Sequence, residues 1–188
     1  MHDLPPIGIT MGDPSGIGPE IILKALADRS LYDICRPVVF GDAGALLEAP
    51  GDLSMPLIHE ITSPREAEGR FGHIDILALS ELNGSDKVPG KPSLSGGRAM
   101  VKFILEAVES ARKGDIAGMV TCPISKVLMQ EAGYAFEGHT QLIAQLTDTE
   151  EYVMMLAGDR LRVCLVTIHC ALKDVPNLLE VTGVYRTI

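Results

Sequence analysis

Three short segments of the sequence carry residue types and spacings that could bind a ligand. The first, residues 10–20 (TMGDPSGIGPE), places three glycines in a tight turn between an apolar run and a helical pattern. Glycine accepts positive φ and lets the backbone approach a ligand, and the N-terminus of the following helix offers free N–H groups to an anion. The spacing differs from G-x-G-x-x-G, and Asp13 and Glu20 make the turn acidic, which argues against a dinucleotide-binding loop. For this segment alone, a plain strand-to-helix turn is the favoured interpretation.

The second segment is residues 138–141 (GHTQ), which precede a short helical pattern ending near residue 146. Thr140 is the predicted N-cap of that helix. His139 would then lie at a helix N-terminus, beside backbone donors that suit a phosphate or carboxylate. A hydrogen bond from His139 to the nearby backbone explains the residue equally well.

The third segment is residues 163–169 (VCLVTIH), an apolar run that ends in a histidine. Ligands of open α/β sheets bind outside the carboxyl ends of the strands, and a neutral imidazole there can ligate a metal. One histidine does not complete a metal site, and no pattern recruits His2, His59 or His73 to it. From these residues alone, metal ligation is the less favoured interpretation of His169.

Apolar runs alternate with helical patterns along the chain, which predicts an α/β fold on a largely parallel sheet. The pattern is weakest between residues 49 and 97. Predicted strands are 7–11, 37–41, 74–79 and 116–121, with a hairpin of 152–157 and 161–168. Predicted helices start near Pro19, cover 43–48, 98–113, 124–132 and 140–146, and resume near Asp174 towards residue 188.

The composition excludes some classes of function. The 188 residues carry a formal net charge of −9, which argues against a nucleic-acid-binding surface. Neither a secretory signal nor a membrane-spanning run is visible, so a cytoplasmic protein without a membrane partner is expected. The four cysteines show no C-x-x-C spacing and are predicted to be buried, reduced thiols: Cys35, Cys122, Cys164 and Cys170.

Taken together and in this order, the three segments resemble the 4-hydroxythreonine-4-phosphate dehydrogenase family. The resemblance runs from about Ile7 to beyond Pro176. The matching stretches are ITMGDPSGIGPEIILKAL, TCPISKVLMQEAGYAFEGHTQLIAQLT, VMMLA and LRVCLVTIHCALKDVP.

The resemblance implies an isocitrate/isopropylmalate-dehydrogenase-like fold, with two α/β domains and a cleft between them. Residues 1–127 would form the first domain, incomplete without a C-terminal segment, and residues 128–188 would begin the second. A homodimer with a shared active site is implied as well. The implied reaction is the oxidation of 4-phosphooxy-L-threonine, assisted by a divalent metal (Zn, Mg or Co), with NAD (or NADP) as acceptor. Its 3-oxo acid product loses carbon dioxide to give aminoacetone phosphate, on the route to pyridoxal phosphate.

The resemblance also assigns residues by position. His139 and Thr140 match the substrate-binding pair, and His169 matches the first metal histidine. Asp13, Gly16, Gly18 and Lys126 fall in possible active-site loops, whereas the cofactor-binding residues stay unassigned. Two positions depart from the family pattern: Ser125 stands where Asn is common, and Gln141 replaces a glutamate, which removes a charge.

The chain is expected to end before the family's active site is complete, because two further metal histidines and a substrate-holding lysine, asparagine and arginine follow in the family. The 188 residues alone are therefore predicted to be inactive. Two alternatives stay open. The first alternative to the reaction above is a sister dehydrogenase that acts on phosphorylated tetronates or aromatic cis-dihydrodiols. The second is a non-catalytic truncated remnant.

Overall fold

The computed structural model describes residues 4–50, 56–136 and 138–188, and the chain divides into two compact units, Met1–Thr147 and Asp148–Ile188. The first unit contains a five-stranded sheet with the order β3-β4-β2-β1-β5, in which every neighbouring pair is parallel. The predicted α/β fold on a parallel sheet is therefore confirmed. Its strands are β1 (Pro6–Thr10), β2 (Arg36–Gly41), β3 (Leu57–Glu60), β4 (His73–Ala78) and β5 (Gly118–Thr121).

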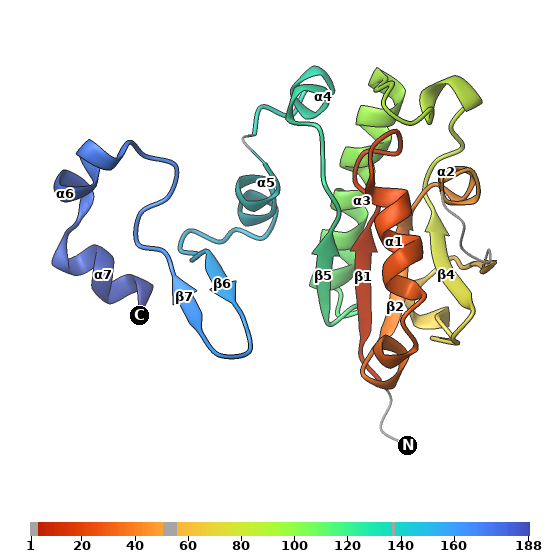
Figure 1. The fold of residues 1–188 in the computed structure, drawn as a ribbon, viewed down its shortest axis with the longest axis horizontal. Coiled ribbons are helices and arrows are strands. Elements are labelled where there is room, and N and C mark those ends of the chain that lie inside the picture. The colour runs from red at the N-terminus through yellow and green to blue at the C-terminus, as the bar shows by residue number, and fades with distance from the viewer. Residues whose placement is uncertain (1–3, 51–55, 137) are drawn as a thin grey trace. The chain divides into compact units, whose positions relative to one another are not determined.

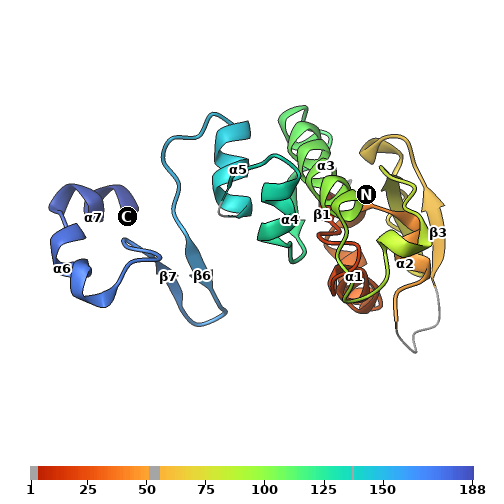
Figure 2. The ribbon, with the colours of Figure 1, turned by 90° about the horizontal axis from the view of Figure 1, so that it is seen from above.

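The helices of this unit cover both faces of the sheet (Figures 1 and 2). The helix α1 (Gly18–Leu26) lies on one face and α3 (Leu94–Arg112) on the other, as expected when parallel strands are joined by crossover connections. Short 3-10 turns occur at Arg29–Asp33, Pro64–Glu66 and Gly84–Asp86. The α-helices are α1 (Gly18–Leu26), α2 (Ala43–Leu47), α3 (Leu94–Arg112), α4 (Lys126–Glu131) and α5 (His139–Leu146).

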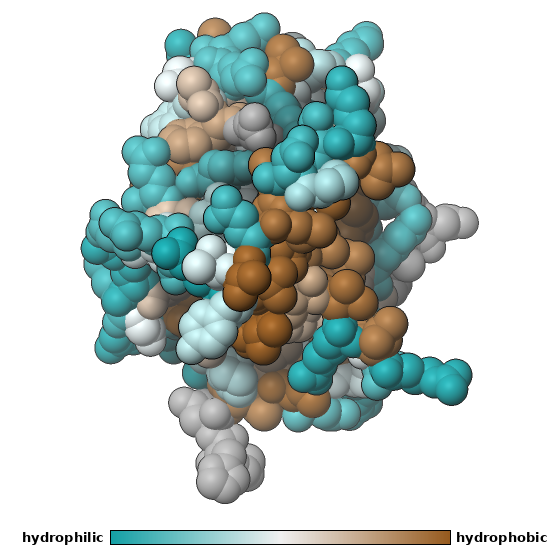
Figure 3. Space-filling view, turned by 90° about the vertical axis from the view of Figure 1, so that its left-hand side faces the viewer, coloured by the Kyte–Doolittle hydropathy of each residue, from teal (hydrophilic) through white to brown (hydrophobic). Residues whose placement is uncertain are grey.

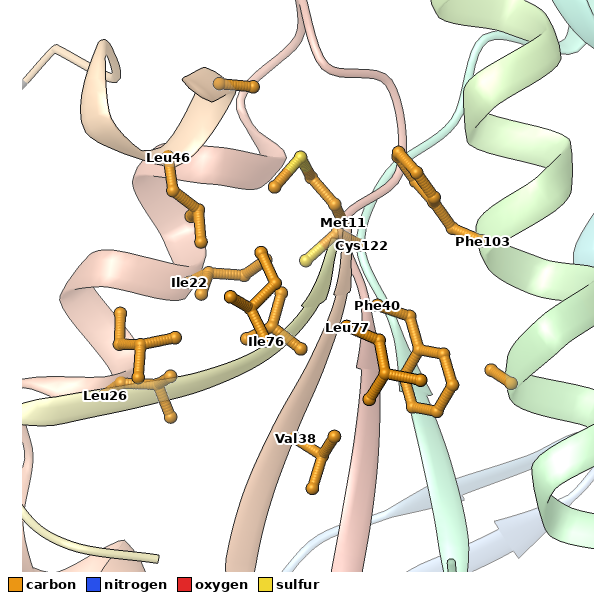
Figure 4. Packing of buried hydrophobic residues seen from close by; sticks show 14 of the residues in the cluster. Met11, Ile22, Leu26, Val38, Phe40, Leu46, Ile76, Leu77, Phe103 and Cys122 are labelled. Atoms are coloured by element: carbon orange, nitrogen blue, oxygen red, sulfur yellow. The ribbon is translucent and has the colours of Figure 1, made fainter. Parts of the chain in front are cut away.

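The core of the first unit lies between the sheet and these helices. Ile22 and Leu46 from α1 and α2 approach the sheet from one side, and Phe103 from α3 approaches it from the other (Figure 4). Phe40 and Phe103 are completely buried. Because aromatic residues are scarce, the remainder of this core consists of aliphatic side chains, methionine and Cys122.

The long helix α3 also carries a second apolar cluster on its other side. Met100 and Ile104 of α3 pack with Leu128 and Met129 of α4 and with Leu142 of α5. This cluster fixes the two short helices against α3, and α3 is itself fixed against the sheet. The helices α4 and α5 are therefore positioned by α3, and α3 is positioned by the sheet.

The sheet and the helix α3 differ from the prediction at three places. The strand β3 was missed, because Leu57–Glu60 is a four-residue edge strand with a mixed pattern. The helix α3 begins at Leu94 rather than at residue 98, since Ser93 Oγ accepts a hydrogen bond from Gly96 N–H at 3.0 Å and caps it earlier. The strand β5 begins at Gly118 rather than at residue 116, and it lies at the edge of the sheet, where Val120 is 55% exposed.

The unit Asp148–Ile188 is small and is described by itself. Its strands β6 (Met155–Ala157) and β7 (Arg162–Cys164) form the predicted antiparallel hairpin, but each is much shorter than expected. A 3-10 turn (Leu172–Asp174) is followed by α6 (Val175–Leu178) and α7 (Val181–Thr187), so the predicted last helix is divided. The helices and strands of this unit contain no buried residue.

Apolar side chains also lie at the surface, as the view in Figure 3 shows. In the unit Asp148–Ile188, Leu156, Leu161 and Tyr185 are all more than half exposed, at 60%, 70% and 82%.

The prediction of four buried thiols is partly wrong, because Cys122 is buried while Cys164 is exposed and the other two are half-buried. In the part of the chain that is described, no helix has the length and apolar character to cross a membrane.

A histidine–aspartate pair joins the edge strand β3 to β4. His59 Nδ1 lies 2.6 Å from Asp75 Oδ1, and Asp75 is only 2% exposed. The second carboxylate oxygen, Asp75 Oδ2, accepts a hydrogen bond from Gly69 N–H at 2.9 Å. The hydrogen bond to Asp75 raises the pKa of His59, and the charges of Asp75, Glu68 and Glu66 act in the same direction.

We expect this pair to make stability depend on pH. A raised folded-state pKa means that the stabilisation is complete below the unfolded pKa of about 6.5 and is lost as the pH rises through the folded value. The difference in unfolding free energy between the wild type and His59→Gln should therefore be largest below the unfolded pKa and should shrink as the pH rises above it, as urea titrations between about pH 5 and about pH 9 would show. A difference that stays constant over this range would rule out the charged pair.

Candidate functional site

The glycine-rich turn after β1 is fastened to the segment that follows β5. Gly12 has a φ of 72°, and a Cβ at this position would lie 2.2 Å from the carbonyl oxygen of Pro123. The same oxygen accepts a hydrogen bond from Asp13 N–H at 3.1 Å. Only glycine fits here, and the contact places the turn beside the chain that leads into α4.

Polar groups of the glycine-rich turn form hydrogen bonds with each other inside the turn. The buried carboxylate of Asp13 accepts hydrogen bonds at Oδ1 from the N–H of Ser15 at 3.0 Å and from its hydroxyl at 2.8 Å. Gly18 is buried, and a Cβ there would lie 1.9 Å from the carbonyl oxygen of Met11, whereas Gly16 is exposed. Packing thus accounts for Gly12 and Gly18, and a ligand-binding role for Asp13, Gly16 and Gly18 stays a prediction.

Lys126 is the first residue of α4. Ser125 caps this helix, because its hydroxyl oxygen accepts a hydrogen bond from Leu128 N–H at 3.3 Å. The helix ends before Gly133, which has a φ of 95°. Lys126 is exposed, and no hydrogen bond or ion pair joins it to another of the described residues.

The helix α5 begins one residue earlier than predicted. Gly138, not Thr140, is its N-cap, and no side chain caps the first turn. The predicted cap is wrong because the chain enters the helix through an extended glycine, which leaves His139 and Thr140 as the first two helical residues. A Cβ at Gly138 would lie 4.0 Å from Lys126 Cε, so the lysine lies along the segment that carries the predicted substrate-binding pair.

His139 is half-buried and Thr140 is exposed. The Nε2 atom of His139 is shielded from solvent and has no hydrogen-bond partner among the residues that the structure describes. Burial lowers the pKa of His139, so the imidazole is uncharged near neutral pH. The pair can therefore donate and accept hydrogen bonds, but it does not itself supply a positive charge.

His169 belongs to the unit Asp148–Ile188. The prediction that a strand runs to residue 168 is wrong, because β7 ends at Cys164, where its three-residue partner β6 ends the pairing. His169 is exposed, with a φ of 52°. Across residues 4–50, 56–136 and 138–188, no three His, Cys, Asp or Glu side chains converge as metal ligands. These residues do not by themselves form a metal site.

One polar cluster was not predicted from the sequence. Asp42 follows β2 and is 1% exposed, and its carboxylate accepts hydrogen bonds from Ala45 N–H, Ser80 Oγ and Leu82 N–H. It borders a cavity of about 410 Å³ that Lys87 also lines. The sequence does indicate one part of this cluster, because a Gly-Asp pair before a helical pattern is typical of a helix whose first turn is capped by the aspartate. Through these three hydrogen bonds, the carboxylate of Asp42 connects residues 80–82 to the start of α2.

Comparison with known proteins identifies what the chain is similar to. Residues 33–188 match the family described as "Pyridoxal phosphate biosynthetic protein PdxA". The chain is 49% identical to the 4-hydroxythreonine-4-phosphate dehydrogenase of Desulfosudis oleivorans, over 100% of this chain and 56% of that protein. It is 41% identical to the D-threonate 4-phosphate dehydrogenase of Cupriavidus necator, over 98% of this chain and 56% of that protein.

A solved structure agrees with these matches. The X-ray crystal structure of a 4-hydroxythreonine-4-phosphate dehydrogenase from Burkholderia phymatum superposes with a TM-score of 0.88 and 39% identity. The superposition covers 98% of this chain and 56% of that one. The chain thus spans a little over half the length of the relatives that it matches.

Proposed function

Because the chain belongs to the PdxA family of pyridoxal phosphate biosynthetic proteins, we propose that it is the substrate-binding half of an NAD-dependent dehydrogenase. The substrate that we propose is 4-phosphooxy-L-threonine, oxidised at its secondary alcohol to a 3-oxo acid. That acid then loses carbon dioxide to give aminoacetone phosphate. The observation that carries the proposal is the 49% identity over the whole chain to a 4-hydroxythreonine-4-phosphate dehydrogenase.

The roles of the residues are proposals on the same basis. His139 and Thr140 bind the substrate at the start of α5, and the contacts of α5 and α4 with α3 hold them in place. The turn that contains Asp13 borders the entry to α4 through the hydrogen bond from Asp13 N–H to the carbonyl oxygen of Pro123. Nicotinamide, when bound, accepts the hydride, and the protein contributes positioning and electrostatics. We assign no residue of this chain to the cofactor.

His169 is proposed as one ligand of a divalent metal. A single exposed histidine gives weak and unselective binding, and the described residues supply no second or third ligand to it. We therefore derive no chemical step through a metal from these residues. Three further features are proposals for a polypeptide of the length of these relatives: a cleft between two α/β domains, a division after residue 127, and a homodimer with a shared site.

A second substrate has a specific observation in its favour. Relatives described as D-threonate 4-phosphate dehydrogenases share up to 41% identity with this chain, close to the values of the first group. Both substrates pair a phosphate with a hydroxy acid, so the described part of the site suits either. The 49% match favours 4-phosphooxy-L-threonine. The non-catalytic alternative is supported by the single predicted metal ligand in the described residues.

The experiment that tests this proposal uses the protein at the length of its relatives. It should reduce NAD when supplied with a divalent metal and 4-phosphooxy-L-threonine, and do so faster than with D-threonate 4-phosphate or an aromatic cis-dihydrodiol. The matched sample is the 188-residue chain under the same conditions, for which we expect no turnover. Faster turnover of D-threonate 4-phosphate would make the second substrate the correct one, and no turnover of any of the three would remove the proposal.

A further inference from the structure

An asparagine–glycine pair lies in the loop that connects β4 to α3. The chain contains two asparagines, and Asn83 is the one that a glycine follows. Asparagine is chemically labile, because the backbone nitrogen of the next residue can attack the carbonyl carbon of its side chain. Glycine at the next position has no side chain to hinder this attack. Whether the pair reacts in the folded chain therefore depends on how firmly the loop holds it.

Both residues of the pair are exposed. Asn83 is the N-cap of the 3-10 turn Gly84–Asp86, but its side chain makes no capping hydrogen bond, nor any other to a described residue. The backbone N–H of Gly84 likewise has no acceptor among the described residues. A Cβ at Gly84 would meet nothing within 4 Å. The carbon that would be attacked and the nitrogen that would attack it are therefore both accessible.

One backbone hydrogen bond restrains the pair. Asp86 N–H donates to the carbonyl oxygen of Asn83 at 2.9 Å. The backbone of Asn83 is extended, with a ψ of 157°, so attack requires a rotation about its Cα–C bond that breaks this hydrogen bond. Because a single exposed backbone hydrogen bond contributes little to stability, the fold should slow the reaction by no more than roughly tenfold relative to an unfolded peptide.

We propose that Asn83 is a site of spontaneous deamidation. The backbone nitrogen of Gly84 loses its proton to water or hydroxide and bonds to the side-chain carbonyl carbon of Asn83. The bond from that carbon to the side-chain nitrogen breaks, and the nitrogen leaves as ammonia. The five-membered imide that results takes up one water molecule at either carbonyl. Opening at one carbonyl gives aspartate, and opening at the other gives isoaspartate, in which the chain continues through the former side chain.

The isoaspartate product would alter a segment that contacts the glycine-rich turn. Before Asn83, Leu82 N–H donates to the carboxylate of Asp42 at 3.0 Å. After it, Gly90 N–H donates to the carbonyl oxygen of Ser15 at 2.8 Å. Isoaspartate lengthens the backbone between these two anchors by one methylene group, so the contact with the turn should weaken. This inference is independent of the proposed function, because the reaction needs only water.

The test follows the 188-residue chain in mildly alkaline buffer, by digestion and mass spectrometry. The peptide that contains Asn83 should gain the mass difference between an amide and an acid, as two products that chromatography separates. The peptide that contains Asn177 is the internal control and should stay unchanged, because Asn177 lies in α6 and is followed by leucine. Gly84→Ala should slow the conversion by roughly tenfold and leave the urea midpoint unchanged, because a Cβ there meets nothing.

A synthetic peptide of residues 79–88 gives the rate without the fold. Conversion in the folded chain within roughly tenfold of the peptide would support the proposal, and slower conversion, or an equal rate in the wild type and Gly84→Ala, would overturn it. The effect on the loop has its own measurement. The Gly90 amide should exchange its hydrogen faster in the isolated isoaspartate fraction than in the fresh chain, and an unchanged rate would contradict a weakened contact with the turn.

Discussion

Replacement of Gly12 by alanine should destabilise the protein by about 4 kcal/mol, which is large for the addition of one methyl group. Two costs add. Alanine at a φ of 72° loses about 1–2 kcal/mol, and its Cβ would lie 2.2 Å from the Pro123 carbonyl oxygen. That oxygen cannot move away without also losing its hydrogen bond from Asp13 N–H. The unfolding free energy from urea titration measures the sum.

A matched control separates the two costs. Gly114 has a φ of 73°, almost the same as Gly12, but a Cβ there would meet nothing within 4 Å. Gly114→Ala should therefore cost only about 1 kcal/mol, the price of the backbone conformation alone. Equal losses in the two variants would show that the contact between the turn and Pro123 is not tight, and the turn would then be free to move relative to α4.

Replacement of Leu142 by alanine should cost about 3 kcal/mol and should loosen α5. Leu142 is 2% exposed and is the one fully buried residue of that helix, where it packs into the cluster formed with α3 and α4. Without it, the eight-residue helix has too few contacts to stay docked, since isolated helices of this length are unstable. Amide hydrogen exchange should therefore accelerate across His139–Leu146 while the sheet stays protected.

The control for this variant is Val127→Ala, on the neighbouring helix α4. Val127 is 64% exposed, so its loss should change the unfolding free energy by no more than about 0.5 kcal/mol. If Leu142→Ala accelerated exchange no more than Val127→Ala, α5 would be held by something other than the cluster on α3. The positions proposed for His139 and Thr140 would then lack their structural basis.

Much of the first unit follows from local sequence signals. The strands β1, β2 and β4 are short apolar runs bounded by glycine, proline or polar residues, and α3 repeats its apolar residues at helical spacing. Such signals depend on neighbouring residues only. The strand β3 gave no comparable signal, because it is stabilised by pairing with β4 and by the contact of His59 with Asp75, which lies far along the chain.

The site was harder to predict for the same reason. Lys126 and Gly138 come together only because α4 and α5 both pack on α3, a contact that spacing in the sequence does not reveal. The backbone enters α5 through Gly138, which is the N-cap. The predicted N-cap, Thr140, lies two residues further along the chain. In the unit Asp148–Ile188, the apolar run 161–168 predicts one continuous strand, whereas the strand covers only Arg162–Cys164 and all three of its residues are exposed.

The central claim is that the start of α5 is where this chain binds the substrate. The most direct measurement is a titration of the 188-residue chain with 4-phosphooxy-L-threonine, in which the amide resonances of His139, Thr140 and Gly114 are followed. We predict saturable shifts at His139 and Thr140 and none at Gly114, because Gly114 lies in the turn after α3, at the opposite end of that helix from its Ser93 cap. Shifts that spare His139 and Thr140, or no saturable shift at any residue, would contradict the claim.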